Sequence, residues 1–235
     1  MCSADGRTPE LRVEVVKRVL ILVEGQSEEA FVGRVLAPHL WSFGVHPESV
    51  VIVTRRRTAG PNDKGGVTSW GQIERDLKLL LSDTSVVAVT TFLDYYGLPS
   101  DVPGMSNRPA ADAVEAVRHV ERSIDSAVGS PRVRSNLNLH EFEALLFADP
   151  DECGRYLGNA ELASGMRAAV AACGGPELVN DDPRTAPSKR ILALHPTYRK
   201  TADGPSLTEK IGLDAIRKAC AHFDSWLDWL EALSS

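Results

Sequence analysis

The sequence indicates an α/β protein with a mainly parallel sheet flanked by helices, followed by a C-terminal helical extension. Up to about residue 150, short apolar segments typical of strands alternate with amphipathic segments at helical spacing. Parallel neighbours need crossover connections, so this β-α-β-α-β-α-β order favours a parallel sheet wrapped by helices. Beyond that point no convincing strand follows. We therefore expect an α/β domain over residues 1–150 and a helical extension over residues 151–235 packed on it.

The composition is that of an ordinary globular protein. The 235 residues include 26 Lys and Arg against 32 Asp and Glu, a net charge of −6, with 43% hydrophobic and 25% charged residues. These values exclude a disordered, collagen-like or disulfide-scaffold protein. The net acidity argues against binding nucleic acid through bulk charge but leaves a local basic groove open. The four cysteines are scattered without a Cys-x-x-Cys pair, so neither structural zinc nor a disulfide framework is expected.

No stretch of the sequence has the character of a membrane segment. No apolar run approaches the roughly 20 residues that cross a bilayer. The N-terminal segment has early acidic residues and no apolar block, unlike a secretory signal. We expect a cytoplasmic protein that contacts no membrane.

The first two strands are expected at residues 19–23 and 50–53, and Glu24 stands at the end of the first. Between them, Ser27 has the position of a helix N-cap. Glu28 lies in the first turn of that helix, where an acidic residue is favourable. A polar, Gly-rich loop is expected after the second strand.

The middle of the chain continues the alternation. Ser69 and Gln72 resemble a capping box that opens the next helix. Residues 86–93 are apolar along most of their length, as expected for a strand covered on both faces, and this strand stops at Asp94. A helix with one apolar side is expected at residues 113–128.

A fourth strand is expected at residues 133–139. Residues 140–147 fit either a helix or a continuation of that strand, which periodicity alone does not decide. In the extension, a second capping box opens a further helix at Ser206. Residues 223–233 form a final amphipathic helix, whose apolar stripe we assign to the core.

Two strands of the expected sheet end in a carboxylate. Ligands of open parallel sheets gather at the carboxyl ends of the strands, and Glu24 and Asp94 stand at two such ends. A carboxylate held there suits a hard cation such as Mg²⁺. The alternative is that Glu24 is a polar loop residue and Asp94 caps a turn, and both interpretations stay open.

The segment His140-Glu141-Phe142-Glu143 closes the fourth strand with three candidate ligands in four residues. In a helix His140 and Glu143 share a face, whereas in a strand Glu141 and Glu143 do. Either arrangement places a carboxylate beside the strand ends. The alternative is a solvated helix start with Phe142 in the core.

Two basic segments are candidate phosphate-binding sites. The first is the loop that carries Arg55, Arg56, Arg57 and Lys64. The second has five cations and no Asp or Glu: Arg184, Lys189, Arg190, Arg199 and Lys200. Such segments bind a nucleic acid backbone because neutralised phosphates release counterions. The alternative is a solvated face that pairs with acidic residues elsewhere.

Several segments together resemble a known family. VLILVEGQSEEAF and VTTFLDYYGLP resemble a Toprim domain, the metal-binding fold of topoisomerases, primases and nucleases of the overcoming-lysogenization-defect (OLD) type. With LNLHEFEALLFADP, NDDPRTAPSKRIL and IGLDAIRKACAHFDSWLDWL, the chain resembles the bacterial DUF4276 family across nearly its whole length. The resemblance implies a Toprim-like fold and, from the settings of the family, an ATPase partner and a role in phage defence.

The resemblance also implies a site. Glu24 matches the Toprim glutamate, a metal ligand or general acid/base, and Asp94 matches the first Asp of an Asp-x-Asp motif. Tyr96 stands where the second Asp is expected, and tyrosine does not replace a carboxylate as a Mg²⁺ ligand at neutral pH. A catalytic site then needs another oxygen donor. We expect Glu141 or Glu143 to supply it, with His140 as an outer partner or proton donor.

The leading hypothesis is a Mg²⁺- or Mn²⁺-dependent nuclease, a phosphodiesterase acting on DNA or RNA. Its metal ligands would be Glu24, Asp94, Glu141 and Glu143, with His140 and Lys189 completing the catalytic group. An alternative is a non-catalytic Toprim-like module that docks on an ATPase. A small-molecule phosphotransferase or phosphatase ranks last, because phosphate-cradling glycines are missing. A second copy of the chain is a further candidate partner.

Overall fold

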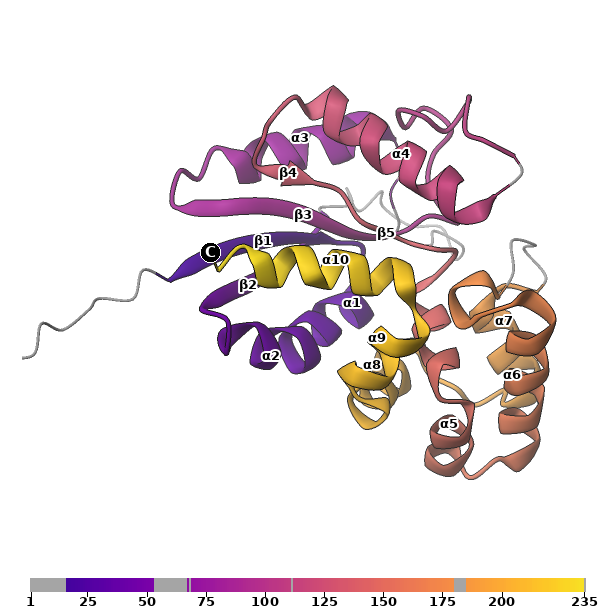
Figure 1. Ribbon diagram of the computed structural model, residues 1–235. Coiled ribbons are helices and arrows are strands. Elements are labelled where there is room, and N and C mark those ends of the chain that lie inside the picture. Colours follow the sequence, from indigo (N-terminus) through magenta and orange to yellow (C-terminus); the bar gives the residue numbers. More distant parts are fainter. Residues whose placement is uncertain (1–15, 53–66, 68, 111, 180–184, 235) are drawn as a thin grey trace, which may run out of the picture.

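A parallel β-sheet with strand order β2-β1-β3-β4 lies at the centre of the computed structural model (Figure 1). The structure describes residues 16–52, 67, 69–110, 112–179 and 185–234. β1 pairs with β2 and β3, and β3 pairs with β4 and β5, in each case in parallel. The predicted α/β class, with a parallel sheet flanked by helices, is confirmed.

The strands are β1 (Lys17–Val23), β2 (Val45–Val51), β3 (Val86–Asp94), β4 (Val133–Arg134) and β5 (Leu137–Asn138). The helical elements of the first part are α1 (Gln26–Phe31), η1 (Val32–Leu36), α2 (Ala37–Trp41), α3 (Trp70–Leu81), α4 (Ala113–Val128) and η2 (Phe142–Ala148). Those that follow are α5 (Pro150–Leu157), α6 (Ala160–Cys173), η3 (Pro176–Leu178), α7 (Pro187–Leu194), α8 (Lys200–Ile211), α9 (Leu213–Ala219) and α10 (Ala221–Ala232).

Helices cover both faces of the sheet, with α3 and α4 on one face and α1, α2 and α10 on the other (Figure 1). Successive residues of a strand point to opposite faces. Accordingly, Val19 and Ile21 of β1 join one hydrophobic core, and Leu20 and Leu22 join the other. The first core also contains residues from most helices beyond residue 150, so these helices and the sheet share one apolar interior.

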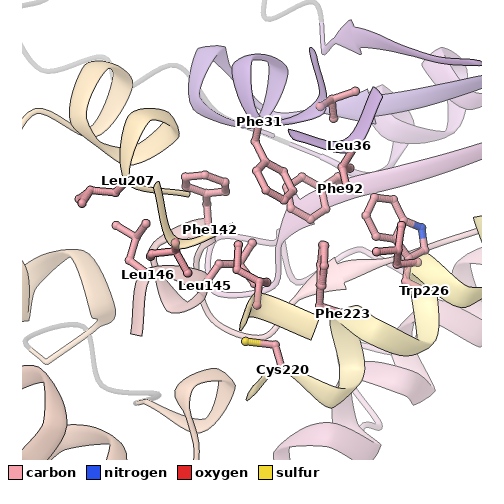
Figure 2. Packing of buried hydrophobic residues seen from close by; sticks show 14 of the residues in the cluster. Phe31, Leu36, Phe92, Phe142, Leu145, Leu146, Leu207, Cys220, Phe223 and Trp226 are labelled. Atoms are coloured by element: carbon pink, nitrogen blue, oxygen red, sulfur yellow. The ribbon is translucent and has the colours of Figure 1, made fainter. Parts of the chain in front are cut away.

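Aromatic side chains from four elements meet in that shared interior (Figure 2). Phe92 of β3 stacks on Phe31 of α1 with ring centroids 5.5 Å apart, and on Trp226 of α10 at 5.2 Å. Phe142 of η2 contacts Phe31 edge-on at 5.6 Å, and Phe223 contacts Trp226. The predicted burial of the apolar stripe of the final helix is confirmed.

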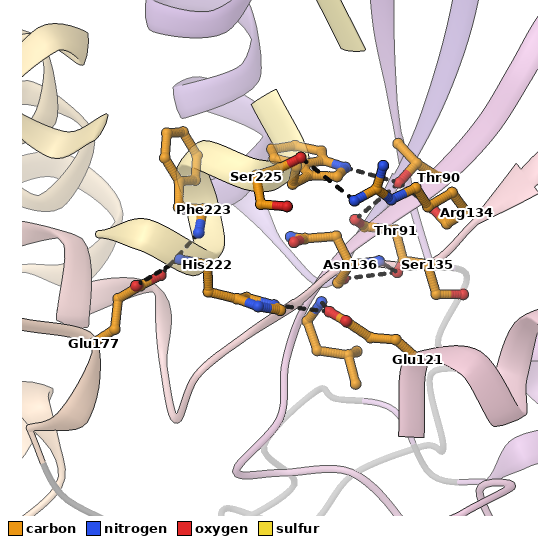
Figure 3. Close-up of polar contacts among 12 residues, drawn as sticks. Thr90, Thr91, Glu121, Arg134, Ser135, Asn136, Glu177, His222, Phe223 and Ser225 are labelled. Atoms are coloured by element: carbon orange, nitrogen blue, oxygen red, sulfur yellow. Dashed lines mark hydrogen bonds and ion pairs between the residues drawn. The ribbon is translucent and has the colours of Figure 1, made fainter. Parts of the chain in front are cut away.

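Polar contacts fix the N-terminal end of α10 (Figure 3). The two carboxylate oxygens of Glu177 accept hydrogen bonds from the main-chain N–H groups of His222 and Phe223, each at 2.9 Å. The His222 ring bonds to Glu121 of α4 at 2.9 Å, where both side chains are buried. Glu177 therefore caps the helix, and the His222–Glu121 contact ties it to the other layer.

The start of α1 differs from the cap expected at Ser27. The helix begins at Gln26 with Gly25 as its N-cap, because the Glu28 carboxylate accepts a hydrogen bond from the Gly25 N–H at 3.1 Å. Ser27 lies inside the helix, and its hydroxyl donates to the carbonyl of Lys200 at 3.3 Å. A carboxylate in the first turn thus replaces the serine cap.

The helix expected to open at Ser206 begins earlier, and Ser206 lies inside α8. Its first turn is fixed by Asp203, whose carboxylate accepts a hydrogen bond from the N–H of Arg199 at 2.8 Å. The Ser206 hydroxyl instead donates to the carbonyl of Ala202 at 2.9 Å, a pattern common within helices.

Two strand expectations also need correction. β2 begins five residues before the expected range of 50–53. The single strand expected at 133–139 is split into β4 and β5, because the Thr91 hydroxyl bonds to both the N–H and the carbonyl of Asn136 between them. The ambiguous segment after β5 is the helical turn η2, which follows a residue with left-handed backbone, His140. α3, α4 and α10 form close to their predicted positions.

Trp226→Ala should lower the free energy of unfolding by about 3–5 kcal/mol, because it removes a large side chain from the shared core. Trp226 is 2% exposed, and its Nε1 donates to Thr90 Oγ1 at 3.0 Å. Urea unfolding followed by circular dichroism measures the change. The control is Trp41→Ala, at a residue that is 53% exposed, which should change stability by about 0.5 kcal/mol or less. Equal losses in both variants would contradict the role of Trp226.

Candidate functional site

The carboxyl ends of three neighbouring strands bring distant acidic residues together. Glu24 follows β1, Asp94 ends β3 and Glu141 comes shortly after β5. The register aligns Val23 with Phe92 and Asp94 with Asn138, so these strands end close together. This edge is where parallel sheets bind ligands.

Asp94 is held by two hydrogen bonds. Its Oδ1 accepts from the side-chain amide of Asn138 at 3.1 Å and from the main-chain N–H of Phe142 at 2.8 Å. Both donors lie on the chain that leaves β5, so Asp94 joins the end of β3 to the start of η2. Its carboxylate is therefore fixed at the rim of the sheet.

Glu28 is a member of the site that sequence patterns did not single out. It is buried and lies one helical turn after Glu24. Burial, followed by the charge of Glu28, raises the pKa of both Glu24 and Asp94, so the three carboxyl groups interact. The four-residue spacing of Glu24 and Glu28 across the strand-helix junction is the sequence signal that could have identified it.

Lys200 contributes a positive charge to this group of carboxylates. Its Nζ lies 3.3 Å from Glu143 Oε2 and 3.8 Å from Glu141 Oε1. The lysine was expected to bind phosphate from a basic strip. In the structure it pairs with two glutamates of the chain itself.

We define the acidic cluster as Glu24, Glu28, Asp94, Glu141 and Glu143, with Lys200 as its associated cation. Burial raises the pKa of Glu143 to about 7, even though Lys200 favours its charged form. Burial, followed by the charges of Glu28 and Glu24, raises the pKa of Asp94 well above its usual range. The pKa of Glu24 is raised first by burial and then by Glu28. The carboxyl groups therefore disfavour one another's charged form and keep their protons more strongly than exposed carboxyl groups do.

The donor types of the acidic cluster suit a hard divalent cation, which prefers carboxylate oxygens. Within the described ranges, however, no group of three or more His, Cys, Asp or Glu side chains is arranged to hold a metal ion as it stands. The contacts explain why: main-chain N–H groups already bind Asp94 and Glu141, and the Lys200 ammonium lies between Glu141 and Glu143. A metal would have to displace Lys200 or shift these carboxylates.

His140 is buried beside the cluster but its side chain lines a different cavity, together with Tyr95 and Tyr96. Its φ is 74°, a backbone conformation that residues other than glycine rarely adopt. The carbonyl of His140 accepts a hydrogen bond from the N–H of Tyr96 at 3.0 Å. His140 therefore positions the chain that follows Asp94.

The second basic segment does not form one continuous strip in the described part of the chain. Arg199 pairs with Asp203 at 2.9 Å, and the guanidinium of Arg190 bonds to the carbonyl of Thr185. Lys189 is exposed on α7, next to Ser188, whose N–H donates to Glu141. Lys189 is thus the expected phosphate ligand that lies near the cluster and faces solvent. Outside the described residues lie Arg55, Arg56, Arg57, Lys64 and Arg184.

The fold and the site define an α/β protein with a buried acidic cluster at the carboxyl ends of parallel strands. The chain belongs to the family described as "Domain of unknown function (DUF4276)", whose model matches residues 23–231, and the predicted family resemblance is confirmed. The structure is similar to the C-terminal region of the Xanthomonas campestris pv. campestris OLD protein, with 19% identity and a TM-score of 0.35 over 93% of this chain and 98% of that one. No curated protein matches the sequence. Of the helices described, none combines the length and apolarity needed to cross a membrane.

Glu143→Gln should flatten the pH dependence of stability. The pKa of Glu143 is about 7 in the folded protein and about 4.5 ordinarily, so between these values the folded state keeps a proton that the unfolded state has lost. Stability from this group is complete below pH 4.5 and is lost as the pH rises to about 7, by up to roughly 3 kcal/mol. The variant should match the wild type at about pH 4 and exceed it at pH 8.

Urea unfolding between about pH 4 and pH 8 in EDTA tests this expectation. The difference between variant and wild type cancels the titration of groups that do not interact with Glu143. Glu161→Gln, at an exposed residue of α6, is the control and should follow the wild-type curve. Parallel curves for Glu143→Gln and the wild type would show that Glu143 titrates normally.

Proposed function

We propose that this protein is a divalent-metal-dependent phosphodiesterase that acts on DNA or RNA. The observation that carries the proposal is the acidic cluster, in which buried and half-buried carboxylates at three strand ends lie together with one half-exposed lysine. Charge of one sign is costly to bury, and a bound cation removes that cost. With a cation bound there, this edge of the sheet is also where a phosphate substrate would be expected to bind.

Glu24, Asp94 and Glu143 would hold the cation, with Glu141 as a further ligand. A bound Mg²⁺ or Mn²⁺ polarises the phosphate and lowers the pKa of an attacking water. Lys189, exposed beside the cluster, would bind a backbone phosphate and offset the charge that develops on it. Lys200, released from its two glutamates, would turn toward the same phosphate. His140 remains our candidate for protonating the leaving oxygen.

Glu24→Gln and Asp94→Asn should each reduce Mn²⁺-dependent cleavage by roughly 100-fold or more, because each removes a carboxylate from the cation site. Gel assays with supercoiled plasmid and with labelled single-stranded DNA and RNA measure the loss. Glu161→Gln is the matched control, since it makes the same chemical change on an exposed helix surface. Cleavage at the wild-type rate by both cluster variants would exclude the acidic cluster as the active site.

Metal binding can be tested without turnover. At a concentration of about 100 times Kd, a ligand stabilises the folded state by about 2.7 kcal/mol. For a chain of this size that is a rise in Tm of roughly 5–10 °C. Mn²⁺ should produce such a rise in the wild type and in Glu161→Gln, but not in Asp94→Asn. A rise of the same size in Asp94→Asn would place the cation elsewhere.

A second candidate is a non-catalytic module of an ATPase complex. The observation that favours it is the pairing of Lys200 with Glu141 and Glu143, which supplies a cation without a metal. This function predicts no Mn²⁺-dependent rise in Tm and co-purification with an ATPase. The ATPase partner, a homodimer and a role in phage defence remain predictions under either function.

A further inference from the structure

A groove adjoins the acidic cluster on the side of α4. Its volume is about 870 Å³, within the range of small-molecule sites. We call it the tyrosine groove and define it by Tyr95, Tyr96, Met105, Arg108 and His140. We propose that the tyrosine groove binds an unpaired nucleobase by stacking, and that single-stranded nucleic acid is the substrate. The inference rests on the proposed phosphodiesterase function for its reaction, but not for its binding step.

The position of the groove connects it to the acidic cluster. Tyr95 and Tyr96 directly follow Asp94, and two residues span at most about 7 Å. Main-chain hydrogen bonds fix both tyrosines, from Tyr95 N to the carbonyl of Asn138 at 3.1 Å and from Tyr96 N to that of His140 at 3.0 Å. A base in the groove would therefore hold its own backbone beside Asp94.

The lining of the groove has the chemistry that stacks on bases. Tyr96 is 38% exposed, and Tyr95 beside it is half-buried. The guanidinium carbon of Arg108 lies 5.9 Å from the centre of the Tyr95 ring, so an aromatic face and a cationic plane line one cavity. Proteins that bind single strands use aromatic rings and arginine planes in this way. The faces of bases in a duplex are already covered by their neighbours, so the groove would select an unpaired base.

The backbone of His140 gives independent support. A left-handed conformation in a residue other than glycine stores strain, and such residues cluster at functional sites. Here the strained residue provides the carbonyl that accepts a hydrogen bond from the main-chain N–H of Tyr96. This hydrogen bond holds the backbone of an exposed aromatic residue two positions after Asp94.

Binding of fluorescent 12-nucleotide probes to the full chain in EDTA tests the proposal without cleavage. The probes are single-stranded DNA, single-stranded RNA and the matching DNA duplex, and fluorescence anisotropy gives each Kd. The wild type should bind at least one single strand roughly tenfold more tightly than the duplex. Tyr96→Ala should remove this preference, weakening single-strand binding about tenfold, because one stacked base contributes about 1–3 kcal/mol.

Two variants separate stacking from general damage. Tyr96→Phe keeps the ring and should bind as the wild type does. Tyr156→Ala removes a tyrosine that is 40% exposed on α5, far along the chain, and should also leave binding unchanged. Single-strand binding by Tyr96→Ala equal to that of the wild type, no binding of any single strand, or tighter binding of the duplex would overturn the proposal.

The binding experiment and the Mn²⁺-dependent cleavage assay together distinguish this inference from the proposed function. Single-strand binding that depends on Tyr96, without Mn²⁺-dependent cleavage, would support the groove and reject the phosphodiesterase. Cleavage that depends on Asp94, with binding indifferent to Tyr96, would support the phosphodiesterase and reject the groove. Tyr96→Ala must keep the wild-type Tm, so that weaker binding reflects the lost ring and not unfolding. Tyr96→Phe, which keeps the ring, should bind single strands as the wild type does.

Discussion

Burial of like charges at one edge of the sheet governs how this molecule is built. Parallel pairing of β1, β3 and β5 places Glu24, Asp94 and Glu141 at adjacent strand ends. The structure compensates in three ways: main-chain N–H groups bind the carboxylates, the Lys200 ammonium pairs with two of them, and burial raises pKa values so that protons are retained. Each of these interactions lowers the free-energy cost of burying the carboxylates. A bound divalent cation would lower that cost further.

The helices after residue 150 supply some of the groups that compensate the buried carboxylates. Lys200 comes from the start of α8, and Ser188, whose N–H binds Glu141, comes from α7. Ser27 of α1 also donates to the carbonyl of Lys200, which links the first helix directly to α8. The acidic cluster is therefore incomplete without the C-terminal helices. The apolar core also depends on the C-terminal helices, because Phe92 of β3 stacks on Trp226 of α10.

Periodicity and strand-end chemistry predicted the parallel sheet and the positions of Glu24 and Asp94, because both depend on local patterns and on one rule of sheet topology. The residues that interact with Glu24 and Asp94 could not be predicted from such local patterns. Lys200 lies far from Glu24 in sequence, and its neighbours suggested a solvent-facing basic strip, whereas its contacts are set by how α8 packs on α1. Glu28 was predicted only as a favourable acidic residue in the first turn of a helix capped by Ser27. In the structure Glu28 accepts the hydrogen bond from the Gly25 N–H, and this local pattern gave no sign of its part in the cluster. Ser206 failed as a helix start because Asp203 supplies a cap that precedes it.

The two candidate functions differ in which cation neutralises the acidic cluster. With Lys200 in place, the carboxylates are partly compensated, and a divalent ion must compete with an ammonium held at 3.3 Å from Glu143. That competition is favourable only if the ion carries more charge into the cluster than the lysine it displaces, which a divalent ion does. The side chain of Lys200 is half-exposed, so the displaced ammonium could move toward solvent. In the proposed function it would then bind the phosphate of the substrate. Under the proposed function, a substrate phosphate that accepts the displaced Lys200 would add to the affinity for the cation, so that cation and substrate would bind cooperatively.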